Sequence, residues 1–124
     1  RVLVNDKVGY AGTADLLLLL KDDRKVLADL KTQGIKLRVT KTKGTIKNEP
    51  NFYDTWEYQL VSYGKCLKVE PDAYMSIVID SIDAGPCHVY EWPLGGRKNA
   101  WKAFLSMHFL WCADKNYWPS TYWQ

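Results

Sequence analysis

The sequence predicts an α/β or α+β fold in which helices flank a central mixed β-sheet. Several short segments carry the hydrophobic pattern of strands, and two longer segments carry hydrophobic residues at helical spacing. The 124 residues have the length of one domain, and 47% hydrophobic with 25% charged residues is typical of a soluble globular protein. The leucine run at residues 16–20 is far shorter than the ~20 apolar residues of a membrane span. We therefore expect one domain over residues 1–124 and no membrane contact.

Three strands are expected in the N-terminal part of the chain. Val2 and Val4 indicate a short first strand, and a turn at residues 5–7 connects it to a second strand over residues 8–20. The polar segment 21–24 predicts another turn. The chain then returns in a third strand, in which side chains alternate between two faces.

This third strand, residues 25–32, places Asp29 and Lys31 on one face, because successive side chains of a strand point to opposite sides. Across the turn, the numbers of paired residues add up to about 45, so Asp15 lies opposite residues 29–31. A shift of one residue would reverse every side chain. We predict an even sum, from a three-residue loop or a bulge, which brings Asp15, Asp29 and Lys31 to one side of the sheet.

A helix is expected after a polar stretch that contains a candidate strand at residues 35–39. Asn51 is the candidate N-cap of this helix. Its hydrophobic stripe at helical spacing lies within residues 55–68 and consists of Trp56, Leu60, Tyr63 and Leu67.

Two strands and a second helix complete the predicted fold. The strands are expected at residues 74–80 and 88–92, the first of them rich in β-branched residues. The helix follows Gly95 and Gly96, and its large side chains are Trp101, Phe104, Leu105, His108 and Trp111. No element is assigned to the aromatic tail from residue 117.

Positive charge is concentrated in one segment, although the net charge is only +3. Between Leu30 and Asn48 there are six cations and no acid: Lys31, Lys36, Arg38, Lys41, Lys43 and Lys47. Such a block is typical of a surface that binds a polyanion such as nucleic acid. The alternative is a solvated loop.

The cysteines and histidines do not indicate a site. Cys66, Cys87 and Cys112 are far apart and lack C-x-x-C spacing, which favours reduced thiols over a zinc or iron–sulfur centre. We therefore expect an intracellular protein, in the cytoplasm or, for a phage-encoded protein, in the host cytoplasm. His88 and His108 lie on separate predicted elements without acids at ligand spacing, so packing or surface roles are expected.

Two carboxylates at the edge of the most hydrophobic region require compensation, because like charges close together repel. Asp15 and Asp29 offer hard oxygen ligands, which suit Mg²⁺ or Mn²⁺ bound together with water and phosphate. The ammonium of Lys31 could then neutralise charge that develops on a phosphate. The alternative is a pair of strand-end carboxylates bridged to nearby lysines.

Three short segments together resemble the PD-(D/E)XK nuclease superfamily, and specifically its RecB-like exonuclease branch. They are Gly12-Thr13-Ala14-Asp15, then Asp29-Leu30-Lys31-Thr32, and Gln59-Leu60-Val61-Ser62-Tyr63, which resembles the Q-x-x-x-Y motif of the branch. The resemblance covers residues 10–68 by motif and the rest by element order. It implies a restriction-endonuclease-like core.

The resemblance also implies residue roles. Asp15 and Asp29 would be metal ligands with the Leu30 carbonyl as a third, Lys31 would be the catalytic lysine, and Gln59 and Tyr63 would place the lysine and the nucleic-acid strand. The sequence departs from the family in lacking, within residues 1–124, the preceding helix whose glutamate supports the metal site. The four-cysteine iron–sulfur cluster of some relatives is not expected either.

The resulting hypothesis is a deoxyribonuclease dependent on Mg²⁺ or Mn²⁺, expected to act as an exonuclease. Five cations of the basic segment would contact the DNA backbone: Lys36, Arg38, Lys41, Lys43 and Lys47. Tyr53 or Trp56 could stack on frayed bases, with helix core as the alternative role. The alternative function is a non-catalytic nucleic-acid-binding module on the same fold. The sequence indicates no oligomeric state.

Overall fold

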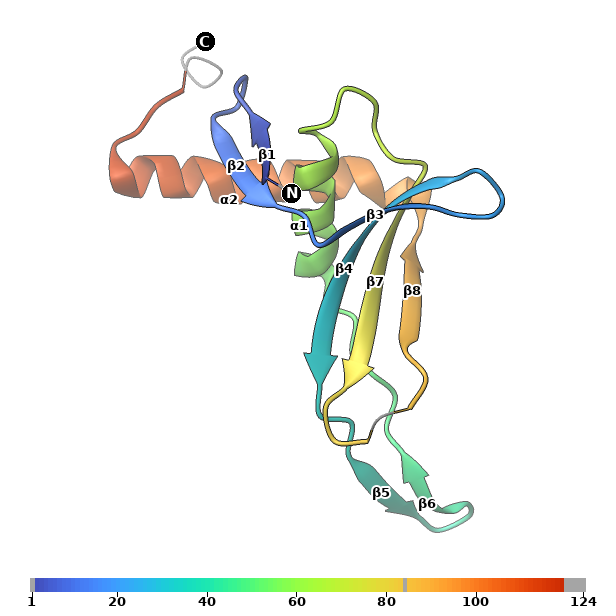
Figure 1. Cartoon of the computed structure of the whole chain (residues 1–124). Helices are drawn as coiled ribbons and strands as arrows, with labels where there is room; N and C mark the ends of the chain where they lie inside the picture. The colour runs from blue at the N-terminus through green and yellow to red at the C-terminus, as the bar shows by residue number, and fades with distance from the viewer. Residues whose placement is uncertain (1, 84, 120–124) are drawn as a thin grey trace.

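The computed structural model describes residues 2–83 and 85–119, and its centre is a four-stranded mixed sheet (Figure 1). β4 and β7 are parallel, and the two outer pairs are antiparallel, which confirms the predicted mixed sheet. In spatial order the strands are β3 (Leu16–Leu19), β4 (Lys25–Gln33), β7 (Ala73–Asp80) and β8 (His88–Trp92).

Two small antiparallel pairs lie at opposite ends of this sheet (Figure 1). β1 (Val2–Asn5) pairs with β2 (Tyr10–Thr13) near the second helix. β5 (Leu37–Thr40) pairs with β6 (Gly44–Lys47) in a hairpin that extends beyond the end of β4. The sequence predicted a strand near β5 but not β6, because β6 has only four residues and one hydrophobic side chain, Ile46, and so lacks a hydrophobic pattern.

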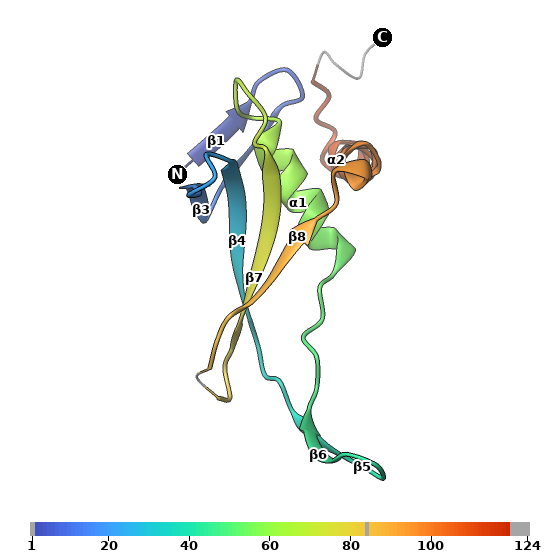
Figure 2. The same ribbon diagram turned by 90° about the vertical axis from the view of Figure 1, so that its right-hand side faces the viewer.

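Both long helices lie on the same side of the sheet (Figure 2). α1 (Asp54–Gly64) lies between the β5–β6 hairpin and β7 in the chain and packs against β4 and β7. α2 (Arg97–Lys115) follows β8 and the short helix η1 (Leu94–Gly96). Within the described residues, no helix is long and apolar enough to cross a membrane.

The main core forms between α1 and the sheet. Leu27 of β4 and Tyr74 of β7 meet Leu60 and Val61 of α1, and all four are almost fully buried. Burying one such side chain stabilises the fold by about 2 kcal/mol. The opposite sheet face holds a second cluster built on Val26, and no described helix covers it (Figure 2).

α1 is shorter than the predicted helix at both ends. Its N-cap is Tyr53, because the backbone of Asn51 is held instead by Gln33, which donates to the Asn51 carbonyl at 2.6 Å and accepts from its N–H at 3.0 Å. The helix ends at Gly64, where a Cβ would lie 1.9 Å from the Tyr74 hydroxyl. The prediction of Asn51 as N-cap was therefore wrong.

The single strand predicted over residues 8–20 is two strands in different sheets. Strand structure is interrupted at Ala14 and Asp15. As a result, β2 pairs with β1, while β3 pairs with β4. β2 contacts α1, because the Tyr10 hydroxyl donates a hydrogen bond to the backbone carbonyl of Ser62 at 2.6 Å. The break has a structural consequence, because it releases Asp15 from regular pairing at the start of β3.

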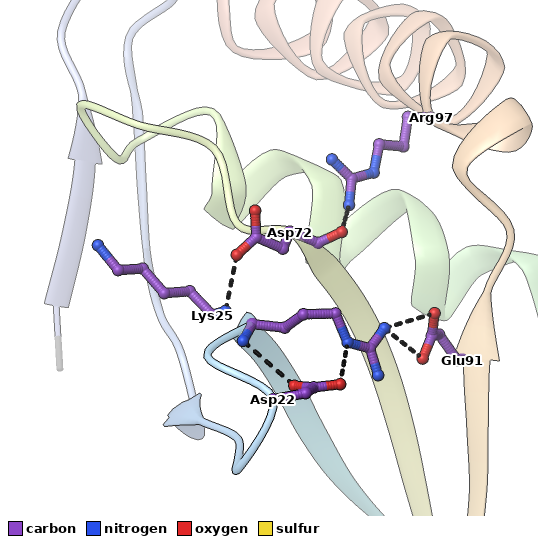
Figure 3. A network of polar contacts seen from close by, with 6 residues as sticks. Asp22, Lys25, Asp72, Glu91 and Arg97 are labelled. Atoms are coloured by element: carbon purple, nitrogen blue, oxygen red, sulfur yellow. Dashed lines mark hydrogen bonds and ion pairs between the residues drawn. The ribbon is translucent and has the colours of Figure 1, made fainter.

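A polar network fixes the end of the sheet where β4 begins (Figure 3). Arg24 donates to Asp22 at 2.9 Å and to both carboxylate oxygens of Glu91 at 3.0 Å. Asp72 accepts from the Lys25 N–H at 2.8 Å, and its carbonyl accepts from Arg97 at 2.8 Å. The β3–β4 turn is thereby tied to β8 and to the start of α2.

Candidate functional site

The register of the β3–β4 hairpin decides whether the two aspartates can meet. Leu16 pairs with Ala28 and Leu19 with Lys25, so the numbers of each pair add up to 44. The loop between the hydrogen-bonded residues Leu20 and Arg24 has three residues, with Asp23 in the left-handed conformation at φ 65°. The predicted even register and three-residue loop are confirmed.

Asp15 lies directly before β3, one position beyond the Leu16–Ala28 pair that ends this register. Its Oδ2 accepts a hydrogen bond of 3.0 Å from the Leu30 N–H. Asp15 thus lies between β2 and β3, and its side chain is hydrogen-bonded to the backbone of β4. Its side chain remains exposed to solvent, which leaves it open to a ligand.

Asp29 and Lys31 point from β4 towards α1, as Leu27 does two residues earlier. The Lys31 ammonium lies 3.4 Å from the Asp29 carboxylate. Asp29 is only 3% exposed, and neither of its carboxylate oxygens has a hydrogen-bond partner among the described residues. A buried carboxylate without hydrogen bonds is destabilising unless positive charge compensates it, so Asp29 is suited to bind a cation.

α1 supplies the polar residues that hold Lys31. The Lys31 ammonium donates to the side-chain oxygen Oε1 of Gln59 at 3.3 Å. The side-chain Nε2 of Gln59 donates in turn to the Tyr63 hydroxyl at 2.9 Å. Gln59 and Tyr63 are one helical turn apart, which explains why the amide can reach the phenol. The lysine, glutamine and tyrosine of the predicted site therefore form one continuous chain of hydrogen bonds.

Gly12 makes room for this chain. A Cβ at Gly12 would lie 2.3 Å from the Cε1 atom of the Tyr63 ring, so β2 can approach α1 this closely only with glycine at that position. Burial raises the pKa of the Tyr63 phenol, and the nearby charges of Asp15 and Asp29 raise it further, against a lowering by Gln59. The Tyr63 phenol therefore stays protonated near neutral pH and interacts electrostatically with both carboxylates.

Trp56 is part of the site in a way that the sequence analysis missed. The Lys31 ammonium lies 5.7 Å from the centre of the Trp56 ring, within the range of a cation–π contact. Trp56 is half-buried and also packs against the core. The available signal was its spacing, since Trp56 lies three residues before Gln59 and shares its helix face.

The basic segment lies apart from the carboxylates. Lys36, Arg38, Lys41 and Lys43 are exposed on or beside the β5–β6 hairpin, beyond the end of β4 (Figures 1 and 2). Lys47 differs from them, because it forms ion pairs with Asp80 and Asp83, and the hydrogen bond to Asp80 raises its pKa. Lys47 thus anchors the hairpin to the sheet.

The ligand set at Asp15 and Asp29 is limited to these two acids. No group of three or more His, Cys, Asp or Glu side chains suited to a metal occurs in the part of the chain that the structure describes. The three cysteines are free thiols. A cation at this site would complete its shell with the Leu30 carbonyl and water, an arrangement that Mg²⁺ tolerates because it retains several waters.

Comparison with known proteins adds no family to this geometry: no protein-family model and no curated protein matches the sequence.

Proposed function

We propose that the protein is a metal-dependent deoxyribonuclease with a restriction-endonuclease-like core, of the PD-(D/E)XK type and its RecB-like exonuclease branch. The observation that carries this proposal is the buried Asp29 carboxylate, which lacks hydrogen bonds and faces the Lys31 ammonium. Asp15, directly before β3, accepts a hydrogen bond from the N–H of Leu30, the residue that follows Asp29. Two hard acids and an amine at one point are the groups that phosphodiester hydrolysis requires. The free thiols accord with an intracellular enzyme.

Mg²⁺ or Mn²⁺ would be held by Asp15, Asp29 and the Leu30 carbonyl. When bound, such an ion supplies positive charge that activates water and offsets charge on the phosphate. The hydrogen bond from Leu30 N–H to Asp15 orients that carboxylate, and burial fixes the rotamer of Asp29. These contacts position the ligands before any substrate arrives.

Lys31 provides the second positive charge. Gln59, Trp56 and Asp29 all lie close to its ammonium and restrict its position. A substrate phosphate that approaches Asp29 would meet the ammonium in a fixed position, where it stabilises the additional negative charge of the transition state. Tyr63 contributes indirectly by holding Gln59.

The β5–β6 hairpin would bind the DNA backbone away from the cleavage point. Lys36, Arg38, Lys41 and Lys43 are exposed there and carry no nearby acid on the hairpin itself. Neutralising phosphates with lysine and arginine releases counterions, so this part of the affinity depends on salt and not on sequence.

A second candidate is a nucleic-acid-binding module without catalysis. It is favoured by one observation: Lys31 already compensates the charge of Asp29, and no third acid stands beside the pair in the described chain. It predicts binding of DNA that weakens with salt, no cleavage, and no metal affinity at the aspartates.

The test is digestion of end-labelled linear, circular and single-stranded DNA with Mg²⁺, Mn²⁺ or EDTA, combined with calorimetric titration of Mn²⁺. The Asp29→Asn variant should lose cleavage by at least about 100-fold and should lose Mn²⁺ binding. Asp6→Asn, which removes an exposed carboxylate from the β1–β2 turn, is the matched control and should behave as the unchanged protein. Loss of linear but not circular DNA would identify an exonuclease.

DNA binding with neither cleavage nor Mn²⁺ uptake would instead establish the non-catalytic module. Equal cleavage by the Asp29→Asn variant would overturn the assignment of this site.

A further inference from the structure

An aromatic pocket adjoins the candidate site where β2, α1 and α2 meet (Figure 1). Its volume is about 400 Å³, which falls within the range of small-ligand sites. Tyr10 comes from β2, Trp56 and Tyr63 from α1, and Phe104 and Met107 from α2. Four of the nine lining residues are thus aromatic, and Ala11, Thr55, Gln59 and Ser62 complete the lining.

The polar atoms around this pocket are largely engaged with one another. The Tyr10 hydroxyl donates to the Ser62 carbonyl at 2.6 Å, and the Ser62 hydroxyl donates to the Gln59 carbonyl at 2.6 Å. The Gln59 side chain is held between Lys31 and Tyr63. Burial raises the pKa of Tyr10, which keeps its phenol protonated as a donor. Besides these groups the lining contributes one more side-chain polar group, the Thr55 hydroxyl, so the pocket offers ring faces and few groups that could hydrogen-bond to the edge of a base.

Trp56 joins this pocket to the phosphate-binding groups. It lines the pocket, and its ring also lies 5.7 Å from the Lys31 ammonium. A ligand that fits both features needs a flat ring and an anionic group about one side chain apart. A nucleotide has this combination, since its base is planar and its phosphate is one sugar away.

We propose that this pocket captures one unstacked base of a single DNA strand, next to the phosphate at Asp29 and Lys31. The inference rests on the proposed nuclease function and deepens it by naming the substrate class. A base inside a duplex is paired and stacked on both sides, so only a single strand or a frayed end can place a base there. Because recognition is by ring stacking, the pocket accepts any base.

The test compares two labelled oligonucleotides with equal numbers of phosphates, one of thymidines and one with abasic positions. Fluorescence anisotropy is measured in EDTA, where no cleavage occurs. The unchanged protein should bind the thymidine strand on the order of tenfold more tightly than the abasic strand, as expected for one stacked base.

Two variants perturb the pocket without touching Lys31 or the aspartates. Ala11→Leu places bulk at the pocket wall, and Phe104→Leu removes a ring that packs 4.7 Å from Tyr10. Each should lower the affinity for the thymidine strand towards the abasic value and leave abasic binding unchanged. Ala113→Leu is the control, because it adds the same bulk at an exposed position of α2 outside the pocket, and it should change neither affinity.

Equal affinity of the unchanged protein for the two strands, or full discrimination by both pocket variants, would overturn the inference. These outcomes are separable from failure of the nuclease function, which is read from cleavage with Mg²⁺ or Mn²⁺. Cleavage by a protein that binds both strands equally would reject the base-binding pocket and support the nuclease function. Tighter binding of the thymidine strand without cleavage would support the pocket and reject the nuclease function.

Discussion

Gln59 is the residue on which the placement of Lys31 depends most directly. Its two hydrogen bonds, to the lysine ammonium and to the Tyr63 hydroxyl, connect β4 to α1 through polar atoms at the edge of the core. The side chain itself is exposed and contributes little to packing. Its effect on activity can therefore be separated from an effect on folding.

Under the proposed nuclease function, the Gln59→Leu variant should lower kcat for DNA cleavage by roughly tenfold or more, because a small displacement of the Lys31 ammonium would be sufficient for such a loss. Affinity for duplex DNA in EDTA should stay nearly constant, since the exposed cations proposed to bind the backbone remain. Gln59→Glu keeps an oxygen acceptor for Lys31 and should recover part of the rate. Steady-state kinetics and anisotropy give the two quantities, and an equal loss in kcat and binding would contradict a positioning role.

At the scale of elements, the β5–β6 hairpin is distinguished by its exposed cations. Two devices hold its base to the sheet: Gln33 clamps Asn51, and Asp80 accepts from the Ile35 N–H at 3.3 Å while pairing with Lys47. These contacts fix the base of the hairpin relative to the sheet. The hairpin extends beyond the end of β4 (Figure 1). In that position it would contact a part of the DNA strand distant from Asp15 and Asp29.

Replacing the four exposed cations of the hairpin by glutamine should weaken binding of duplex DNA and reduce the slope of log affinity against log salt by roughly 3. The four positions are Lys36, Arg38, Lys41 and Lys43. Anisotropy titrations at several salt concentrations measure both effects. A control with the same change of charge replaces Lys21, Lys68, Lys98 and Lys102, and an equal reduction of slope there would show that the hairpin has no special role.

At the scale of the whole molecule, Asp80 connects three segments that are distant in the chain. It pairs with Lys47 of β6 and accepts hydrogen bonds from the N–H groups of Ile82 and Ile35. Lys47 and then these N–H groups hold the pKa of the Asp80 carboxyl well below its usual range. Because the folded state lowers this pKa, the stabilisation is present above the ordinary aspartate pKa of about 4 and is lost as the pH falls below it.

The Asp80→Asn variant should therefore melt several degrees lower than the unchanged protein near neutral pH, and the difference should shrink on acidification below about pH 4. Thermal unfolding followed by circular dichroism across this pH range measures the effect. Asp83→Asn removes the exposed partner of Lys47 and should have a small effect, as surface ion pairs do. A difference that grows as the pH falls would contradict the assignment.

Much of the candidate site could be predicted because its residues are related by local periodicity. Alternation along β4 is sufficient to place Asp29 and Lys31 on one face, and a spacing of four residues is sufficient to align Gln59 with Tyr63. The even hairpin register was also predictable, since a polar segment of this length favours a short loop. The break at Asp15 was not predictable, because Asp15 is followed directly by five leucines and no proline or turn motif marks the end of β2.

The sequence by itself determined the order of the main helices and strands, the face of each side chain within one element, and the position of the cations. Only the tertiary structure decided that residues 8–20 divide between two sheets, that Trp56 lies beside Lys31, and that Lys47 is held by Asp80. The reason is physical: backbone geometry sets directions within an element, whereas contacts between elements depend on packing among residues that are distant in the chain.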